Sequence, residues 1–383
     1  MTFTLTIDRK IFDKHLSTTL SQYEETGATI TPVIKGNGYG FGRRFLAQEA
    51  TRLGVKRIAI GTVYELDQAL TDFGDEVLVL EPFNPADSLA LSAWEKAMQV
   101  AANRVIATVS GPHLAQASRA GIKKAMVEGK TSLHRFGIEP IELLSILNGD
   151  HHNISILGFS LHLPINEPVN VQINQLESSA NFFGKNGSNR LIEIASWLNT
   201  FASVFKNLNS PLHVSISHVS AKEVKEIAKI TSVRDLNVSF EVRLGTSLWL
   251  GEPKALEASG TVLEIHELTG DHEHVGYRQV DSHGNARLLV VSGGTSHGVA
   301  VAAPTYRSSP RAKSVAIAEG FAQALGKVRS PFKLAGKNLT FAEPPHMHVS
   351  LLWCEDKKIK VGDQVTCTVR NTTANFDRIV EIN

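Results

Sequence analysis

The chain has 383 residues, with 39 Lys and Arg against 38 Asp and Glu, a formal net charge of +1, and 42% hydrophobic residues. This near-neutral balance argues against a nucleic-acid-binding protein, which would carry a basic excess or a basic stripe. The length suits two domains, or one large barrel with an appendage, so size alone does not restrict the fold.

The cysteines and the apolar segments exclude two further classes. Cys354 and Cys367 are too few for a disulfide framework or a Cys-rich zinc site, so we expect two buried, reduced thiols. The first residues, MTFTLTIDRK, contain no apolar signal region, and no segment reaches the ~18 consecutive apolar residues of a membrane span. We therefore expect a globular, cytoplasmic protein that does not act at a membrane.

Short apolar strands alternate with amphipathic helices up to about residue 250. The expected strands are 29–34, 57–61, 76–80, 105–109, 124–127, 154–161, 212–216 and 238–242. The expected helices are 45–53, 63–71, 90–98, 113–120, a segment after Pro140, 190–205 and 222–230. Such alternation indicates a parallel sheet that is covered on both faces.

The number of strands favours a (β/α)8 barrel over a doubly wound sheet, which usually stops at about five to seven strands. We expect the barrel over residues 9–252. After Pro253 the hydropathy pattern changes: apolar and polar positions alternate in short runs that are separated by turn residues, which predicts antiparallel strands. Residues 253–383, together with an N-terminal strand in 1–8, are therefore expected to form a mainly β domain with one helix at 314–325. Chemistry is expected at the carboxyl ends of the barrel strands.

Lys35 follows the first barrel strand in the segment ITPVIKGNGYGFG and precedes four alternate glycines. A Walker loop needs its lysine after the glycines, and a GxGxxG fingerprint would need glycine where Phe41 or Arg43 stands, so neither phosphate loop fits. What remains is a lysine at the rim of a barrel, where desolvation lowers the pKa of the amine and allows a Schiff base with a carbonyl. A solvated lysine before a tight turn is the alternative.

Two further segments place polar residues at strand ends. Arg243, in FEVRLGTSLWLG, is followed by Gly245 and Thr246, whose backbone N–H groups can approach an anion. Alternatively, this is a barrel-closing turn with a surface arginine. His162 ends the apolar run LGFSLHLP, where a histidine is either catalytic or a satisfied core residue.

Together these segments resemble a known family. PVIKGNGYGFG resembles the VVKANAYGHG segment of the alanine racemase family, the fold-type III enzymes that use pyridoxal 5′-phosphate, and the similarity continues into IAIGTVYELDQAL. Further landmarks follow in family order: KTSLHRFGIEP, LGFSLHLP, VSISHVSA, VRLGTSLWLG, VGYRQV, LAGKNLTFAEPPHMHVSL, KVGDQV and TANFDRIVEI. The resemblance covers nearly the whole chain.

The resemblance implies pyridoxal 5′-phosphate as the cofactor and Lys35 as the catalytic base that forms the Schiff base with it. The other implied cofactor-binding residues are Tyr39, Ser220, Gly245 and Thr246 at the phosphate, His162 against the pyridine ring and Arg243 at the pyridine nitrogen. A guanidinium at that nitrogen keeps it unprotonated and favours proton exchange over side reactions. Arg135 and Met347 are implied to orient the substrate.

The sequence departs from the family at three supporting positions. Glu128 stands where many members have a carbamylated lysine, and its carboxylate could supply the same charge to Arg135. Phe376 replaces a phosphate-binding tyrosine, so one hydroxyl contact is lost. Val219 replaces an asparagine.

The fourth departure concerns the second acid/base. The family takes it from a tyrosine across the dimer interface, in a segment like IGYADGYPR, and here VVSGGTSHGVA places Gly293 or Gly294 at that position. Racemisation through two bases needs a proton donor on each face of the substrate, and Lys35 serves one face. We expect His297 to be the replacement, with His346 and His348 as further candidates.

The expected function is therefore a racemase that interconverts L- and D-alanine or another small amino acid in D-amino acid metabolism. The protein would be a homodimer that shares its active site across the interface. Two alternatives stay open: a lyase, aldolase or dehydratase that acts on a D-amino acid, and a non-catalytic cofactor-binding regulator. The HMH and HEH segments at 346–348 and 272–274 each offer two ligands at strand spacing, too few to predict a metal site.

Overall fold

The computed structural model describes residues 2–111, 113–143, 154–167, 188–204, 211–269, 273–282, 286–301 and 328–383, with positions 311, 314, 315, 317 and 320. The chain divides into two compact units. A barrel unit comprises His15–Gly38 and Arg43–Gly251, and a β unit comprises Met1–Lys14, Tyr39–Gly42 and Glu252–Asn383.

The barrel unit contains eight parallel strands, hydrogen-bonded in the order β2-β10-β8-β7-β6-β5-β4-β3. Their bounds are β2 (Thr29–Pro32), β3 (Arg57–Ile60), β4 (Glu76–Pro82), β5 (Val105–Val109), β6 (Lys124–Gly129), β7 (Ser155–His162), β8 (Leu212–Ser217) and β10 (Leu236–Leu244). The short strand β9 (Ser232–Val233) pairs antiparallel with β10. A bridge between Val33 and Ala59 links the ends of β2 and β3, so the sheet is a nearly closed barrel.

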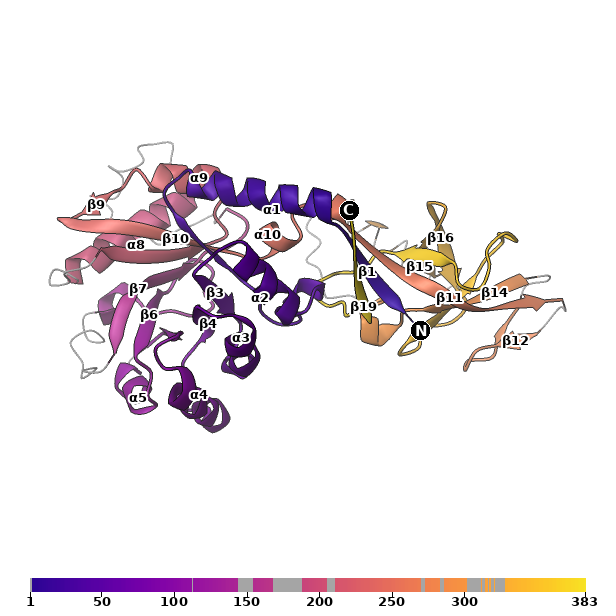
Figure 1. Cartoon of the computed structure of the whole chain (residues 1–383), viewed down its shortest axis with the longest axis horizontal. Helices are drawn as coiled ribbons and strands as arrows, with labels where there is room; N and C mark the ends of the chain where they lie inside the picture. The colour runs from indigo at the N-terminus through magenta and orange to yellow at the C-terminus, as the bar shows by residue number, and fades with distance from the viewer. Residues whose placement is uncertain are drawn as a thin grey trace. The chain divides into compact units, whose positions relative to one another are not determined.

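Helices follow the strands and lie around their outside (Figure 1). They are α1 (Arg9–Glu24), α2 (Arg43–Arg52), α3 (Leu66–Asp72), α4 (Ser88–Ala101), α5 (Leu114–Arg119), α8 (Asn189–Val204), α9 (Ala221–Ile227) and α10 (Thr246–Trp249). Short 3-10 turns are η1 (Gly38–Gly40), η2 (Val63–Glu65), η3 (Pro140–Glu142), η5 (Pro253–Ala255) and η6 (Thr295–His297). At the start of α4, the Asp87 carboxylate caps the helix by accepting hydrogen bonds from the backbone N–H groups of Leu89 and Ala90.

Apolar side chains from five successive strands fill the barrel interior. The buried members of this cluster are Val33, Ala59, Leu78, Ile106 and Met126. Interior packing of branched and other apolar side chains is typical of (β/α)8 barrels, whose interior is a core rather than a pore. The predicted fold class, a barrel followed by a mainly β domain, is confirmed.

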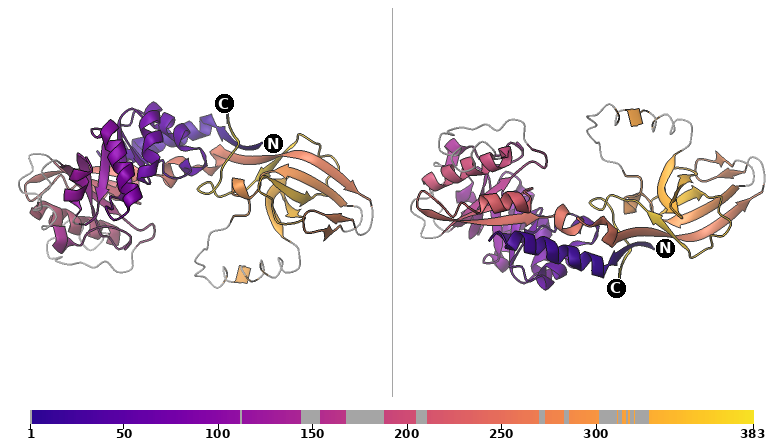
Figure 2. Two further views of the ribbon diagram at one scale, coloured as in Figure 1. Left: turned by 90° about the horizontal axis from the view of Figure 1, so that it is seen from below. Right: turned by 90° about the horizontal axis from the view of Figure 1, so that it is seen from above.

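The β unit is built around one mainly antiparallel sheet, whose strands appear in orange to yellow in Figure 2 except for the indigo N-terminal strand. Its strands run in the order β14-β17-β16-β15-β18-β11-β1-β19, and a further pairing of β14 with β11 closes six of them into a ring. Their bounds are β1 (Phe3–Asp8), β11 (Leu256–Leu268), β14 (Ala286–Ser292), β15 (Arg329–Leu334), β16 (Lys337–Phe341), β17 (Val349–Trp353), β18 (Gln364–Cys367) and β19 (Arg378–Ile382). β12 (His274–Val275) and β13 (Val280–Asp281) form a separate hairpin.

The N-terminal strand joins this sheet: β1 pairs antiparallel with β11 and parallel with β19. The alternate residues Phe3, Leu5 and Ile7 of β1 are buried, as the period of a strand requires. Both cysteines are buried free thiols, as expected. The helix expected at 314–325 lies largely outside the described residues. Among the described helices, none is long and apolar enough to cross a membrane.

Candidate active site

Lys35 lies just beyond β2, and the loops around it are held by one carboxylate. Glu65 accepts the backbone N–H of Gly36 at 3.0 Å and that of Gly61 at 2.7 Å, which ties the ends of β2 and β3 together. A Cβ at Gly61 would lie 3.2 Å from Lys35 Cβ and 3.2 Å from Glu65 Oε1, so glycine leaves the space that the lysine stem fills. Lys35 is thereby packed at a fixed point of the rim.

The amine of Lys35 stands in a positively charged environment. Burial lowers its pKa, the charges of Arg135 and Arg243 lower it further, and Glu65 opposes them. Within the described ranges the Lys35 amine has no hydrogen-bond or ion-pair partner. A desolvated, unpaired amine of this kind is suited to act as a base or nucleophile.

Arg243, near the end of β10, is buried and points across the barrel to β7. Its guanidinium donates to the Ser160 hydroxyl and, at 2.9 Å, to the carbonyl oxygen of Leu161. Two hydrogen bonds to β7, which lies two strands away from β10 in the sheet, fix the planar group, and a surface arginine would not make them. The alternative of a surface arginine therefore does not hold.

His162 ends β7 beside these cations. Burial and the charges of Arg243 and Arg135 lower the pKa of its imidazole to about 2, so the ring is neutral at physiological pH. Its Nδ1 lies 2.9 Å from the Ser217 hydroxyl. A neutral ring can pack flat against an aromatic cofactor without adding charge.

The loop that carries Arg135 is held from two sides. The Thr131 hydroxyl donates to the carbonyl oxygen of His162 at 2.5 Å, and Glu193 of α8 accepts both the backbone N–H and the hydroxyl of Ser132, at 2.5 and 2.8 Å. Arg135 itself is exposed and lies over the Phe136 ring at 5.1 Å. Glu193 was not predicted, because it lies 61 residues from Ser132 and no local pattern in the sequence marks it.

Glu128 of β6 is buried at 3% exposure. Burial raises the pKa of its carboxyl, while the charges of Arg243 and Arg135 oppose that rise. The expectation that its carboxylate balances Arg135 stays a prediction.

Ser220 is the N-cap of α9, and its donors are already engaged. Its backbone N–H and its hydroxyl both donate to Glu223 at 2.8 Å, and Glu223 is also paired with Arg190 at 3.0 Å. An incoming phosphate would have to move the Glu223 carboxylate to reach these donors. The role of Glu223 at Ser220 was not predicted, although Ser-x-x-Glu is the sequence pattern of a capping box.

Gly245 and Thr246 lie at the start of α10, where the first backbone N–H groups have no partner inside the helix. The indole of Trp249 donates to the carbonyl oxygen of Val33 at 2.8 Å, so this turn is tied to the segment that leads to Lys35. The predicted phosphate loop is thus well anchored within the barrel unit.

The β unit contains the remaining predicted site residues. His297 is buried at 6% exposure; its Nδ1 accepts the Gly294 N–H at 3.2 Å and its Nε2 lies 3.3 Å from Asp377 Oδ1. Both ring nitrogens are therefore engaged, and its role as second base stays a prediction. Met347 is exposed at 65%, and its carbonyl oxygen accepts the Ser296 hydroxyl at 2.6 Å.

The positions that replace the expected tyrosine cannot hold a side chain in this backbone. A Cβ at Gly294 would overlap the carbonyl oxygen of His346, and one at Gly293, where φ is +111°, would lie 2.7 Å from the Phe3 ring.

Tyr39 is buried, and burial raises the pKa of its phenol to about 12. Phe376 stacks on Phe3 with 5.3 Å between ring centroids.

The candidate metal ligands that the structure describes do not form a cluster. Among the described residues no three His, Cys, Asp or Glu side chains are grouped as a metal would need. His346 Nε2 instead lies 2.6 Å from Glu343. His272, of the second candidate segment, lies outside the described residues.

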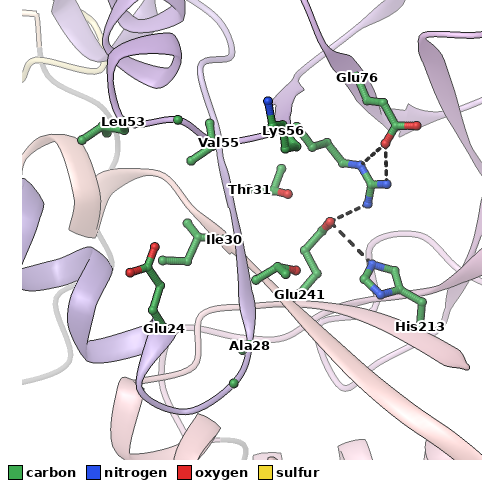
Figure 3. A pocket seen from close by; sticks show the side chains of 14 residues that line it. Glu24, Ala28, Ile30, Thr31, Leu53, Val55, Lys56, Glu76, His213 and Glu241 are labelled. Carbon is green, nitrogen blue, oxygen red and sulfur yellow. Dashed lines mark hydrogen bonds and ion pairs between the residues drawn. The ribbon is translucent and has the colours of Figure 1, made fainter.

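A cavity of about 470 Å³ opens at the other end of the barrel, where the strands begin (Figure 3). Glu241, at 3% side-chain exposure, lies 2.5 Å from Arg57, and Arg57 lies 2.6 Å from Glu76. His213 Nε2 is 3.5 Å from Glu241. Since chemistry in barrels occurs at the opposite face, we assign this ionic network to stability.

The cluster at the carboxyl ends of the strands fits an anionic carbonyl cofactor. Three cations, Lys35, Arg135 and Arg243, lie near two carboxylates: Glu65 acts on Lys35, and the buried Glu128 is acted on by both arginines. Phosphate and carboxylate groups would neutralise this excess. The cluster also contains a neutral histidine, His162, that could pack against an aromatic ring.

The comparisons with known proteins agree. The model of the alanine racemase N-terminal domain matches residues 7–219, more than half of the chain, and the protein therefore belongs to the alanine racemase family. No curated protein sequence matches the chain.

Solved alanine racemases share the whole fold. The enzyme of Clostridium difficile 630 is 16% identical, with a TM-score of 0.66 and coverage of 100% of this chain and 97% of that one. The Bacillus anthracis enzyme, solved with bound L-Ala-P, is 15% identical, with a TM-score of 0.65 and coverage of 100% and 95%. The Bartonella henselae enzyme, solved with covalently bound pyridoxal phosphate, is 15% identical, with a TM-score of 0.63 and coverage of 100% of both chains.

Proposed function

We propose that the protein is a pyridoxal-phosphate-dependent racemase that interconverts the L and D forms of alanine or another small amino acid. The observation that carries this proposal is Lys35, a packed and unpaired amine whose pKa is lowered by burial and by Arg135 and Arg243. When bound, the cofactor supplies a carbonyl carbon for the substrate amine and a conjugated ring that stabilises charge at the α-carbon.

The residues of the chain have separate tasks in this proposal. The neutral form of Lys35 takes or returns the α-proton on one face of the substrate, which a lowered pKa favours. Arg243, held by Ser160 and Leu161, offers a fixed hydrogen-bond donor to a ring nitrogen and cannot give up its proton readily. The exposed Arg135 orients the carboxylate of the substrate.

Other residues would hold the cofactor. Backbone N–H groups at Gly245 and Thr246, the hydroxyl of Ser220 and the phenol of Tyr39 are proposed to bind its phosphate, with Glu223 moving away from Ser220. The neutral His162 would lie against the ring. The family resemblance supports a homodimer in which Met347 of the β unit contacts the substrate.

The second acid/base is the open element of this proposal. The expectation that His297 has this role requires the ring to break its bond with Gly294 or Asp377, because a neutral imidazole with both nitrogens engaged has no free lone pair.

The test compares the wild-type protein with Lys35→Ala and with Lys56→Ala, a control lysine that is 84% exposed. We expect bound cofactor to give a visible absorption band in the wild type and in Lys56→Ala, and no such band in Lys35→Ala. A panel of L-amino acids is then incubated in heavy water, and D-enantiomer and α-deuterium are measured.

Formation of the D-enantiomer that depends on Lys35 supports the racemase. A protein that cannot take up the cofactor refutes the proposal altogether. Cofactor binding with α-deuterium exchange but no D-enantiomer refutes racemisation and favours a lyase. Cofactor binding with neither exchange nor D-enantiomer favours a non-catalytic regulator.

A further inference from the structure

Racemisation needs a second group that can exchange a proton on the face opposite Lys35, and few residues of the barrel unit qualify. Arg135 and Arg243 do not give up their protons readily. The Glu65 carboxylate is occupied by two backbone N–H groups, and Glu128 is buried at 3% exposure. The histidines at the rim are the remaining titratable groups that could take this role.

His218 comes directly after β8 in an unusual backbone conformation. Its φ is +59°, a left-handed value that costs about 1 kcal/mol or more for a residue other than glycine. Two contacts hold it: Nδ1 lies 2.7 Å from the carbonyl oxygen of Leu163, and the ring meets His162 edge to face, with 4.9 Å between centroids. The strained backbone thus presents the ring at the rim beside His162.

The bond to Leu163 fixes the tautomer of His218. A carbonyl oxygen only accepts, so Nδ1 must carry the proton. In the neutral ring Nε2 is then a lone-pair nitrogen, and within the described ranges it has no partner. This contrasts with His297, in which both nitrogens are engaged.

Strand order places His218 at the same rim as Lys35, two strands away in the sheet. β10, which carries Arg243, is hydrogen-bonded to β2 on one side and to β8 on the other, and Arg243 is in register with Thr31 and Ser217. Two strand spacings of about 4.8 Å separate the backbones that lead to Lys35 and His218 by roughly 10 Å. Proton transfer from both faces of one carbon needs the two nitrogens roughly 6–7 Å apart. The charge of Lys35 is among those that lower the pKa of His218, so the two side chains lie within electrostatic range of each other.

The charges around His218 favour the unprotonated form of its imidazole, which is the form that can act as a base. Burial lowers the pKa of its imidazole, the bond to Leu163 opposes this, and the charges of Arg243, Lys35 and Arg135 lower it further. The ring is neutral at physiological pH. A lowered pKa also makes its protonated form a better proton donor.

We infer that His218 is the second acid/base of the proposed racemase, in the same barrel as Lys35. In one direction Nε2 removes the α-proton, the electron pair of the broken C–H bond stays with the substrate, and the ammonium of Lys35 returns a proton to the opposite face. The reverse direction exchanges the two roles, so one proton is taken and one is given in each turnover. This inference rests on the proposed function and replaces the expectation for His297.

The test uses His218→Asn, because asparagine tolerates positive φ and its amide can still donate to Leu163, but it does not titrate. We expect the cofactor band to be unchanged and racemisation to fall by about 100-fold or more. Exchange of the α-proton of one enantiomer with deuterated solvent, which Lys35 alone can perform, should stay within a few-fold of wild type. His266→Asn, at an exposed position of β11, is the matched control and should retain racemisation.

Each other outcome overturns the inference. Full racemisation in His218→Asn removes His218 from the chemistry. Equal loss of racemisation, exchange and cofactor binding makes it a structural residue. Loss in His297→Asn with retention in His218→Asn returns the role to His297. A wild-type protein that binds cofactor but neither racemises nor exchanges refutes the proposed function itself, and the inference with it.

Discussion

The ionic network at the start of the barrel strands makes Glu241→Gln the sharpest test of stability. Glu241 Oε2 lies 2.5 Å from Arg57 (Figure 3). Its Oε1 accepts the Ser215 hydroxyl at 2.8 Å. The substitution keeps the shape of the side chain and removes its charge. Arg57 then keeps only Glu76, at 2.6 Å, as an ionic partner among the residues described.

The magnitude follows from the pKa of Glu241. Burial alone would raise it, but the imidazole of His213, the charge of Arg57 and the hydroxyl of Ser215 hold it at about 2, against an ordinary value of 4.5. At about 1.4 kcal/mol per pH unit, this difference corresponds to roughly 3 kcal/mol of folding free energy at pH 7. A buried pair that loses one partner typically costs about 3–5 kcal/mol, which agrees with this value.

The sign of the pH dependence is fixed by the direction of that pKa. A carboxyl whose pKa is lowered in the folded state contributes its full stabilisation of the fold at pH values above its unfolded pKa of 4.5. This contribution is lost as the pH falls toward the folded-state pKa of about 2. The cost of Glu241→Gln should therefore drop from roughly 3 kcal/mol at pH 7 to roughly half of that or less near pH 3.

The assay is urea unfolding followed by tryptophan fluorescence, with wild type and variant compared at both pH values. Glu76→Gln is the matched control: its side chain is 30% exposed, so we expect a cost of at most about 1 kcal/mol. A cost below about 1 kcal/mol for Glu241→Gln at pH 7, or an equal cost at pH 7 and pH 3, would refute the reasoning.

Three further predictions concern packing and the site. Gly294→Tyr, which reinstates the family side chain, should destabilise the β unit by more than about 3 kcal/mol because its Cβ overlaps the His346 carbonyl; an unchanged thermal midpoint contradicts this. Glu193→Gln weakens the bonds to Ser132 and should raise KM for the substrate about 10-fold with little change in kcat; an unaltered KM contradicts the positioning role. Trp249→Phe should cost about 1 kcal/mol in urea unfolding, and a neutral result would show that its hydrogen bond contributes nothing.

The barrel could be predicted because its elements are encoded locally. Runs such as Arg57–Ile60 and Val105–Val109 are short, apolar and bounded by turn residues, and the structure has strands there. Helix α1 is absent from the sequence-based prediction although its buried residues Phe12, Leu16 and Leu20 recur at helical spacing. Its serines and threonines are weak helix formers, so tertiary packing rather than propensity stabilises it.

The candidate site could be predicted only in part. Lys35 and Arg243 are recognisable because each follows or ends a strand beside glycines, and strand ends are where a barrel places its chemistry. His218 also follows a strand, but nothing in SISHVSA signals a left-handed backbone or an unpaired Nε2. The engagement of both ring nitrogens in His297 has no sequence signal either.

The sequence by itself determined the alternation of strands and helices, the position of Lys35 at a strand end and the family to which the chain belongs. The tertiary structure decided which charges meet: Glu241 with Arg57 over 184 residues of separation, and Glu193 with Ser132 over 61. Apolar periodicity is a property of neighbouring residues, whereas a pKa or a free lone pair depends on groups that approach only when distant strands pack. For that reason the lysine is visible in the chain, and the histidine proposed to face it emerges only from the folded barrel.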